Sequence, residues 1–209
     1  MNKIFTLSLD DGHPHDKIAA EIMLKYGVRG TFYPNLYRIN KCHKDIHVKL
    51  EIGSHGLTHE DPRKMDQKTL EKFVSRKPFE DFLGKPIKMF ASPWGFYDNK
   101  VIVAIKEEGY IGARNIKKDL TYSHPKNPFC MEITFVAGRI PTFKEFKPEF
   151  DKFLKEKEGL FHIAAHCSGV HLSDIFGPNT FEQFEEICKY VRKSKIDSLT
   201  NCEAIENMP

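Results

Sequence analysis

Short apolar runs alternate with longer amphipathic segments along most of the 209-residue chain. The short runs contain many β-branched and aromatic residues, a pattern that predicts strands. They lie at Lys3–Leu9, Gly30–Pro34, Leu50–Ser54, Lys88–Ser92, Tyr110–Asn115, Met131–Ala137, Phe161–His166 and Ser198–Thr200. The segments between them repeat apolar residues every three or four positions and therefore predict helices. They lie at His15–Lys25, Asp66–Leu83, Asn99–Glu108, Thr142–Glu158 and Thr180–Lys193.

This alternation of strands and helices predicts an α/β fold, with a mostly parallel sheet and right-handed crossovers. The sheet is either open or closed into a barrel. No internal repeat, low-complexity segment or linker divides the chain, so we expect residues 1–209 to form a single domain. In both forms of the fold, the active site lies at the carboxyl ends of the strands.

The composition narrows the class of protein. Hydrophobic residues make up 40% of the chain and charged residues 29%, a balance that excludes a disordered chain. The 32 basic and 29 acidic residues leave a net charge of only +3, which gives no support to nucleic-acid binding. No apolar run approaches the ~18 residues that a membrane-spanning helix needs.

The cysteines and the first predicted strand indicate the cellular compartment of the protein. The five cysteines are odd in number and never spaced as Cys-x-x-Cys, which is typical of free thiols in a reducing compartment. The apolar stretch from Ile4 to Leu9 is too short for a signal-peptide core and continues directly into two aspartates. We therefore expect a cytoplasmic protein, unless an export signal precedes this numbering.

Polar residues gather where the predicted strands end. Asp10 and Asp11 close the first strand, and such adjacent carboxylates favour a nearby cation or proton, although Asp-Asp-Gly also fits a solvated turn. His55 and His59, four residues apart after the third strand, can bring two imidazoles to one ion. With Asp11 they make three protein ligands, a number typical of catalytic rather than structural zinc. Iron, cobalt, manganese or nickel could occupy the same set.

Four short motifs carry a resemblance to a known family. They are Ser-Leu-Asp-Asp-Gly at 8–12, Ser-His-Gly-Leu-Thr-His at 54–59, Ser-Pro-Trp-Gly at 92–95 and Ile-Ala-Ala-His at 163–166. In this order they resemble the polysaccharide deacetylases, carbohydrate esterase family 4, also called the NodB homology domain. The resemblance spans roughly residues 3–170 and implies a distorted, incomplete (β/α) barrel of about seven parallel strands.

The resemblance also implies an activity and residue roles. The expected enzyme is a metal-dependent hydrolase that removes N-acetyl groups from an amino sugar or an N-acetylglucosamine-containing glycan. Asp10 resembles the family's catalytic base, and His166 resembles its general acid. Asp11, His55 and His59 resemble the metal ligands, with zinc the expected ion.

The third motif departs from the family pattern. Pro93 and Trp94 resemble the family's Arg-x-Pro-Tyr-Gly wall segment, in which the backbone N–H of Trp94 would face the reacting carbonyl oxygen. Ala91 stands where the family has the arginine that orients the catalytic aspartate, and the Asp-x-x-Asp-Trp motif has no clear counterpart. Arg114 is either a substitute that orients Asp10 or a surface arginine.

Other histidines have weaker interpretations. His13 and His15 either line the pocket or cap the helix that follows them. Cys42, His43 and His47 fit a loop surface better than a second metal site, since no carboxylate is implied beside them.

Two other functions remain open at this point. The same fold and metal could act on another linear or cyclic amide, or the chain could be a non-catalytic carbohydrate-binding relative, given Ala91. The presence of both Asp10 and His166 favours catalysis, because binding alone needs neither a base nor an acid. The expected substrate is an acetylated amino sugar, and a cytoplasmic location would favour a small, lipid-linked or nucleotide-linked one.

Overall fold

The computed structural model of the chain describes residues 3–119, 121–136, 140–167 and 180–207. Its strands are β1 Lys3–Asp11, β2 Thr31–Pro34, β3 Glu51–Ile52, β4 Met89–Ala91, β5 Gly112–Lys118, β6 Met131–Ile133, β7 Phe135–Val136, β8 Gly159–His166 and β9 Asp197–Ser198. Its α-helices are α1 Asp16–Tyr26, α2 Lys41–His47, α3 Gln67–Val74, α4 Lys77–Leu83, α5 Asn99–Glu107, α6 Phe143–Phe153, α8 Thr180–Ser194 and α9 Asn201–Glu206. Short 3-10 turns lie at Pro62–Lys64, Pro93–Gly95 and Pro128–Cys130. Ala137, the last residue of one predicted strand, lies outside the described residues.

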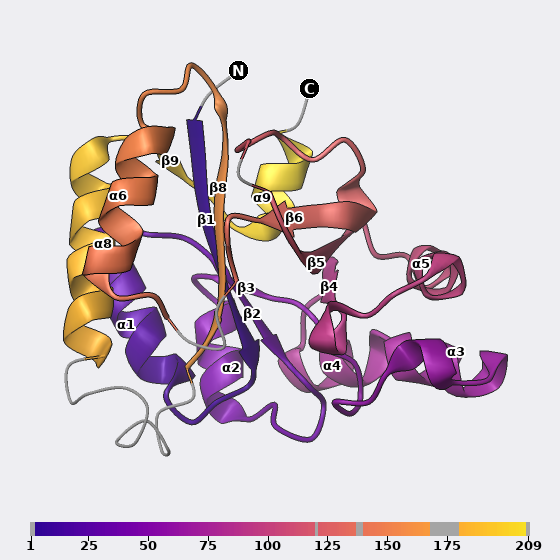
Figure 1. Cartoon of the computed structure of the whole chain (residues 1–209). Coiled ribbons are helices and arrows are strands. Elements are labelled where there is room, and N and C mark those ends of the chain that lie inside the picture. Colours follow the sequence, from indigo (N-terminus) through magenta and orange to yellow (C-terminus); the bar gives the residue numbers. More distant parts are fainter. Residues whose placement is uncertain (1–2, 120, 137–139, 168–179, 208–209) are drawn as a thin grey trace.

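The strands form two parallel sheets that together make an incomplete barrel (Figure 1). One sheet has the order β3-β2-β1-β8-β7, with β9 beside β1, and the other has the order β4-β5-β6. A bridge between Ser54 and Phe90 joins β3 to β4, and residues 131–136 pass from β6 in one sheet to β7 in the other. The predicted (β/α) barrel of about seven parallel strands is confirmed, with β6 and β7 counted as one bent strand and β9 as an addition beside β1.

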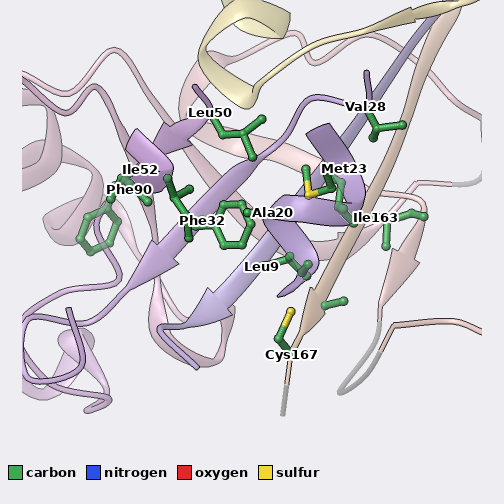
Figure 2. Close-up of a cluster of buried hydrophobic side chains, with 14 of the residues drawn as sticks. Leu9, Ala20, Met23, Val28, Phe32, Leu50, Ile52, Phe90, Ile163 and Cys167 are labelled. Carbon is green, nitrogen blue, oxygen red and sulfur yellow. The ribbon is translucent and has the colours of Figure 1, made fainter. Parts of the chain in front are cut away.

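Helices cover the outer face of β1 and β8. In Figure 1, α1, α6 and α8 stack beside these two strands, and α8 packs against both of the other helices. The phenylalanine stripe of α6 lies in the core, where the ring of Phe150 is 5.1 Å from that of Phe161 on β8. Figure 2 shows the neighbouring part of the core, in which Leu9 and Phe32 come from adjacent strands and Met23 comes from α1. The apolar residues that repeat along α6 therefore pack into the core.

Alternate residues of β1 face the barrel interior. Phe5, Leu7 and Leu9 are in the hydrophobic core, because successive side chains of a strand point to opposite faces. The residues between them are polar and have polar partners: the hydroxyl of Thr6 donates to Asn201, and the hydroxyl of Ser8 lies 3.0 Å from Nε2 of His162. The interior of the barrel is consequently polar along this strand, and Asp10 continues the same face.

The prediction of one helix over Asp66–Leu83 is wrong. The chain forms two helices, α3 and α4, and Ser75 between them has an extended backbone with ψ of 129°. Pro78 explains the break, since proline has no amide hydrogen and its ring would collide with a carbonyl one turn earlier in a continuous helix.

Two short helices were not predicted. Residues 41–47 form α2 and residues 201–206 form α9, and both are too short to show a clear apolar period. Thr200 was expected in a strand but instead caps α9, where its hydroxyl accepts the N–H of Glu203 and the carboxylate of Glu203 accepts the N–H of Thr200. This Thr-x-x-Glu capping box was the sequence signal for the helix.

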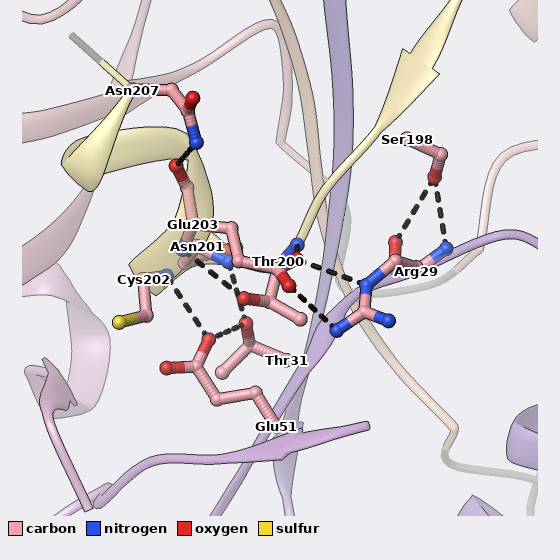
Figure 3. Close-up of polar contacts among 9 residues, drawn as sticks. All are labelled: Arg29, Thr31, Glu51, Ser198, Thr200, Asn201, Cys202, Glu203 and Asn207. Atoms are coloured by element: carbon pink, nitrogen blue, oxygen red, sulfur yellow. Dashed lines mark hydrogen bonds and ion pairs between the residues drawn. The ribbon is translucent and has the colours of Figure 1, made fainter. Parts of the chain in front are cut away.

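The C-terminal segment closes the amino-terminal end of the barrel (Figure 3). The N–H of Asn201 donates to the hydroxyl of Thr31 over 2.8 Å, and the N–H of Cys202 donates to the carboxylate of Glu51 over 3.1 Å. The Thr31 hydroxyl in turn donates to Glu51. Because Thr31 and Glu51 begin β2 and β3, this closure lies at the opposite end of the barrel from Asp10 and Asp11.

The buried Glu51 predicts a stability that depends on pH. Burial raises the pKa of Glu51 from 4.5 to about 7, despite the hydrogen bonds from Thr31 and Cys202 that favour its charged form. The folded protein therefore holds a proton that the unfolded chain releases, and stability falls as pH rises from about 4.5 towards 7. Glutamine does not titrate, so this loss is absent in Glu51→Gln. We therefore expect the melting temperature of Glu51→Gln, relative to that of wild type, to be higher at about pH 8 than at about pH 5.

Melting temperatures at the two pH values test this prediction. Glu21→Gln, at an exposed position of α1, is the matched control and should keep a constant difference from wild type. If the Glu51→Gln difference is also constant, Glu51 does not hold an extra proton in the folded state.

Candidate active site

One cleft at the carboxyl ends of the strands gathers most of the residues that the sequence singled out. It has a volume of about 310 Å³. The residues that line it are Asp10, Asp11, His55, His59, Ser92, Trp94, Gly95, Arg114, Ile116, Ile133, Ala164 and His166. Pro93 is not among them and is instead buried at the start of a 3-10 turn. His13 and His15 are not among them either, so neither lines this cleft.

Asp11, His55 and His59 form a cluster with the donor atoms of a metal site. Oδ1 of Asp11 lies 3.3 Å from Nε2 of His59 and 3.5 Å from Nε2 of His55. One ligand atom from each residue lies within 4.8 Å of the others. Two ligands of a tetrahedral zinc, each about 2.0–2.1 Å from the ion, are separated by roughly 3.3 Å. The buried Oδ1 has no hydrogen-bond partner among the described residues, so this donor set fits a divalent cation.

His55 is held in the form that a metal ligand requires. Its ring is buried, and Nδ1 donates a hydrogen bond to the carbonyl oxygen of Ala91 over 2.7 Å, which leaves Nε2 free to accept. Burial lowers the pKa of His55 to about 4, so the imidazole is neutral near neutral pH. Ala91 therefore contributes to the site through its backbone.

The Asp11 side chain reaches the cleft from an unusual backbone conformation. Asp11 has a φ of 76°, in the left-handed region that non-glycine residues rarely adopt. Gly12 follows with a φ of 71°, and a Cβ at this position would lie 2.7 Å from the Cβ of Pro34. The tight packing of the loop against Pro34 thus fixes the turn that carries the carboxylate.

A buried, hydrogen-bonded pair of side chains, Asp16 and His43, supports the turn that follows Asp11. The carboxylate of Asp16 accepts the backbone N–H of His13 over 3.0 Å and lies 3.1 Å from Nε2 of His43. Nδ1 of His43 accepts the N–H of Asn40, so Nε2 carries the hydrogen and donates it to Asp16. The prediction of a loop is wrong for Cys42, His43 and His47, which all lie on α2, and His43 is fully buried there. Sequence reasoning did not identify Asp16, whose role depends on a partner 27 residues away.

Arg114 pairs with Asp10 inside the barrel. The guanidinium Nη2 of Arg114, on β5, donates to both carboxylate oxygens of Asp10. Arg114 is 1% exposed, which excludes the surface-arginine interpretation. Burial alone would raise the pKa of Asp10, but Arg114, His55 and His166 together hold it below its usual value. Asp10 is therefore ionised near neutral pH.

His166 lies beside this pair. It ends β8, and its backbone is in register with that of Asp10 on β1. Its Nε2 lies 3.8 Å from Oδ2 of Asp11, and its Nδ1 is buried without a hydrogen-bond partner among the described residues. His162, on the same strand, is different, since it bonds to Ser8 and to the carbonyl of Glu132, and its burial lowers its pKa to about 3. His166 is thus the histidine of β8 that lines the cleft.

Neither interpretation of His15 matches the structure. His15 occupies the N-cap position of α1, but its side chain makes no capping hydrogen bond. Its ring instead lies 5.0 Å from that of His13 and 5.6 Å from that of Phe181. Aromatic packing therefore accounts for its position.

The described part of the chain contains no helix that combines the length and the apolar character needed to cross a membrane.

The fold is similar to that of solved carbohydrate esterase family 4 proteins. The Xyl-CE4 domain of a multidomain xylanase from the hindgut metagenome of Trinervitermes trinervoides gives a TM-score of 0.64 at 18% identity, covering 99% of this chain and 91% of that one. A family 4 acetyl xylan esterase from Clostridium thermocellum, in complex with a cobalt ion, gives 0.65 at 17%, covering 98% and 91%. A CE4 family pseudoenzyme from Bacillus anthracis gives 0.61 at 15%, covering 98% and 66%. At these identities the likeness concerns the fold alone.

The sequence comparisons identify the family. No curated protein matches the chain. Residues 2–113, more than half of the chain, match the family model described as polysaccharide deacetylase. The matched segment includes Asp10, Asp11, His55, His59 and Trp94 of the cleft. The chain belongs to the polysaccharide deacetylase family.

Proposed function

We propose that the chain is a metal-dependent deacetylase that removes N-acetyl groups from an amino sugar or an N-acetylglucosamine-containing glycan. Membership of the polysaccharide deacetylase family supports carbohydrate deacetylase activity. The observation that carries the more specific proposal is the arrangement of the cleft. A cluster of metal-ligand type, a carboxylate paired with an arginine and a histidine with an unpartnered ring nitrogen lie together there.

The metal would be held by Asp11, His55 and His59. Imidazole and carboxylate suit zinc, and cobalt, manganese, nickel or iron could use the same residues. When bound, such an ion polarises the carbonyl group of the substrate and makes a water molecule acidic enough to lose a proton near neutral pH.

Asp10 serves as the general base in this proposal. The carboxylate is ionised because the buried guanidinium of Arg114 offsets the effect of its burial on the pKa. It can therefore accept the proton of the attacking water. Arg114 is a positioning residue, since its hydrogen bonds to both oxygens fix the orientation of the carboxylate.

His166 serves as the general acid, and Trp94 supplies a backbone donor. Attack of water on the amide carbon places negative charge on the carbonyl oxygen, which the N–H of Trp94 would stabilise. The amine is a poor leaving group until it is protonated, and His166 supplies that proton as the C–N bond breaks. The products are acetate and the free amino sugar.

Arg114 also bears on the competing interpretations. The non-catalytic alternative was suggested by Ala91, where the family has its orienting arginine. The hydrogen bonds from Arg114 to Asp10 supply an arginine from the next strand instead, which supports a catalytic carboxylate. We keep a cytoplasmic location as part of the proposal, and it favours a small, lipid-linked or nucleotide-linked sugar over a cell-wall polymer.

Acetate release from a panel of N-acetylated sugars, from monomers to oligomers, tests the proposed function. The protein is stripped of metal and then supplied with zinc or cobalt, and Asp10→Asn is the control. We expect release that depends on added metal and falls by about 10²–10⁴ in Asp10→Asn, because the general base is removed. Stoichiometric metal binding without release from any of these sugars would favour another amide or a binding protein.

His166→Ala tests the general acid. We expect the rate to fall by about 10²–10⁴, because the leaving amine loses its proton donor, while metal binding is retained. His15→Ala is the matched control, since His15 does not line the cleft, and it should leave the rate unchanged. An unchanged rate in His166→Ala would remove this residue from the mechanism.

Arg114 variants test whether the orientation of Asp10 matters. We expect Arg114→Met to lower kcat by about 10²-fold with little change in metal affinity, since a small misplacement of a catalytic group has an effect of this size. Arg114→Lys keeps the charge without the planar fork and should lie between Arg114→Met and wild type. Because an unpaired buried carboxylate can destabilise the fold by about 3–5 kcal/mol, circular dichroism measures the folded fraction first. Wild-type kcat in the folded Arg114→Met variant would show that Arg114 has no orienting role.

A further inference from the structure

The two histidines of the proposed metal site are held in different ways. The ring of His55 is buried and fixed by its hydrogen bond to the carbonyl of Ala91. The side chain of His59 is 30% exposed, and no hydrogen bond from the described residues reaches its Nδ1. Metal-binding histidines almost always use their second ring nitrogen in a hydrogen bond that fixes the ring. The described residues supply no such hydrogen bond to His59, which leaves the orientation of its ring to solvent and to side-chain packing.

Trp94 provides a contact that can constrain His59. The two rings meet edge to face, with centroids 4.6 Å apart and an angle of 70° between their planes. This separation lies in the range that aromatic pairs favour. The indole Nε1 also donates a hydrogen bond to the backbone carbonyl of His59 over 3.2 Å. A single side chain thus contacts both the ring and the main chain of His59.

The backbone conformation of Trp94 is energetically unfavourable. Its φ is 58° and its ψ is 5°, a left-handed conformation that is rare for a bulky residue and costs about 1–3 kcal/mol. Gly95 follows with a φ of 67°, and a Cβ there would lie 2.3 Å from Ile116, so the turn is fixed against β5. Trp94 is also 58% exposed, and burial in the core does not account for so large a side chain. Glycine at position 94 would suit the backbone better.

We propose that Trp94 is a positioning residue whose side chain holds the imidazole of His59 ready to bind metal. The indole restricts the ring so that Nε2 stays near Asp11, 3.3 Å from its Oδ1. This role rests on the proposed function, which places the metal on Asp11, His55 and His59. It belongs to the indole and is separate from the role of the Trp94 backbone N–H in that proposal.

Trp94→Gly separates metal affinity from stability. The variant relieves the left-handed strain, so we expect its melting temperature without metal to equal or exceed that of wild type. Its affinity for zinc or cobalt should fall about 10–100-fold, the usual effect of removing a group that orients a metal ligand. Trp94→Phe keeps an aromatic ring beside His59 and should recover most of the affinity.

Calorimetric titration of the metal-free proteins with zinc, and visible absorption of the cobalt-loaded proteins, are the measurements. Phe96→Leu is the matched control, because Phe96 is a partly exposed aromatic residue next to the same turn that does not line the cleft. It should leave the zinc affinity and the cobalt spectrum unchanged. A changed cobalt spectrum in Trp94→Gly would report an altered ligand arrangement directly.

The outcomes distinguish this inference from the proposed function. If Trp94→Gly binds zinc as tightly as wild type and only raises KM, the indole acts solely on substrate and the inference is wrong. If the wild-type protein binds no metal, or binds it equally well as Asp11→Asn, the proposed metal site itself is wrong and the inference fails with it.

Discussion

The buried ion pair between Asp10 and Arg114 is the interaction on which the cleft depends. Removing either charge from water alone would cost several kcal/mol, so each requires the other inside the barrel. The pair also explains the altered third motif. Arg114 reaches Asp10 from β5, and the strand before it carries Ala91, whose carbonyl oxygen holds His55 instead. The arginine that pairs with Asp10 therefore comes from β5, whereas position 91 on β4 contributes its backbone carbonyl.

A polar face of β1 connects this pair to the closed end of the barrel. Thr6, Ser8 and Asp10 alternate with core residues, and their polar partners come from α9, β8 and β5 respectively. Buried polar groups stabilise a structure only when they are satisfied, so this interior also restricts how the surrounding strands can pack. The C-terminal helix is part of the arrangement, because its first residue supplies the amide oxygen that accepts the hydroxyl of Thr6.

The sequence predicted the features that depend on local pattern. Asp10, Asp11 and His55 could be grouped because each follows an apolar run, and parallel strands place such positions at one end of the barrel. Burial of Arg114 could not be predicted, since Gly-Ala-Arg-Asn shows no alternation that separates interior from surface. The pairing of Asp16 with His43 was missed for a related reason, since a histidine in a polar segment gives no sign of a partner on another helix. The break at Pro78, by contrast, is a local signal that the helical period concealed.

Two left-handed residues in the cleft indicate how its geometry is maintained. Asp11 and Trp94 both adopt positive φ without being glycine, and each is followed by a glycine whose packing leaves no room for a Cβ. The turns are therefore imposed by the neighbouring structure, since the preferences of the two residues themselves oppose them. Both turns direct a side chain onto the proposed metal cluster, Asp11 as a ligand and Trp94 against His59. Turns imposed in this way fix a side chain before a ligand binds, and in the proposed function they would hold Asp11 and His59 ready for the metal.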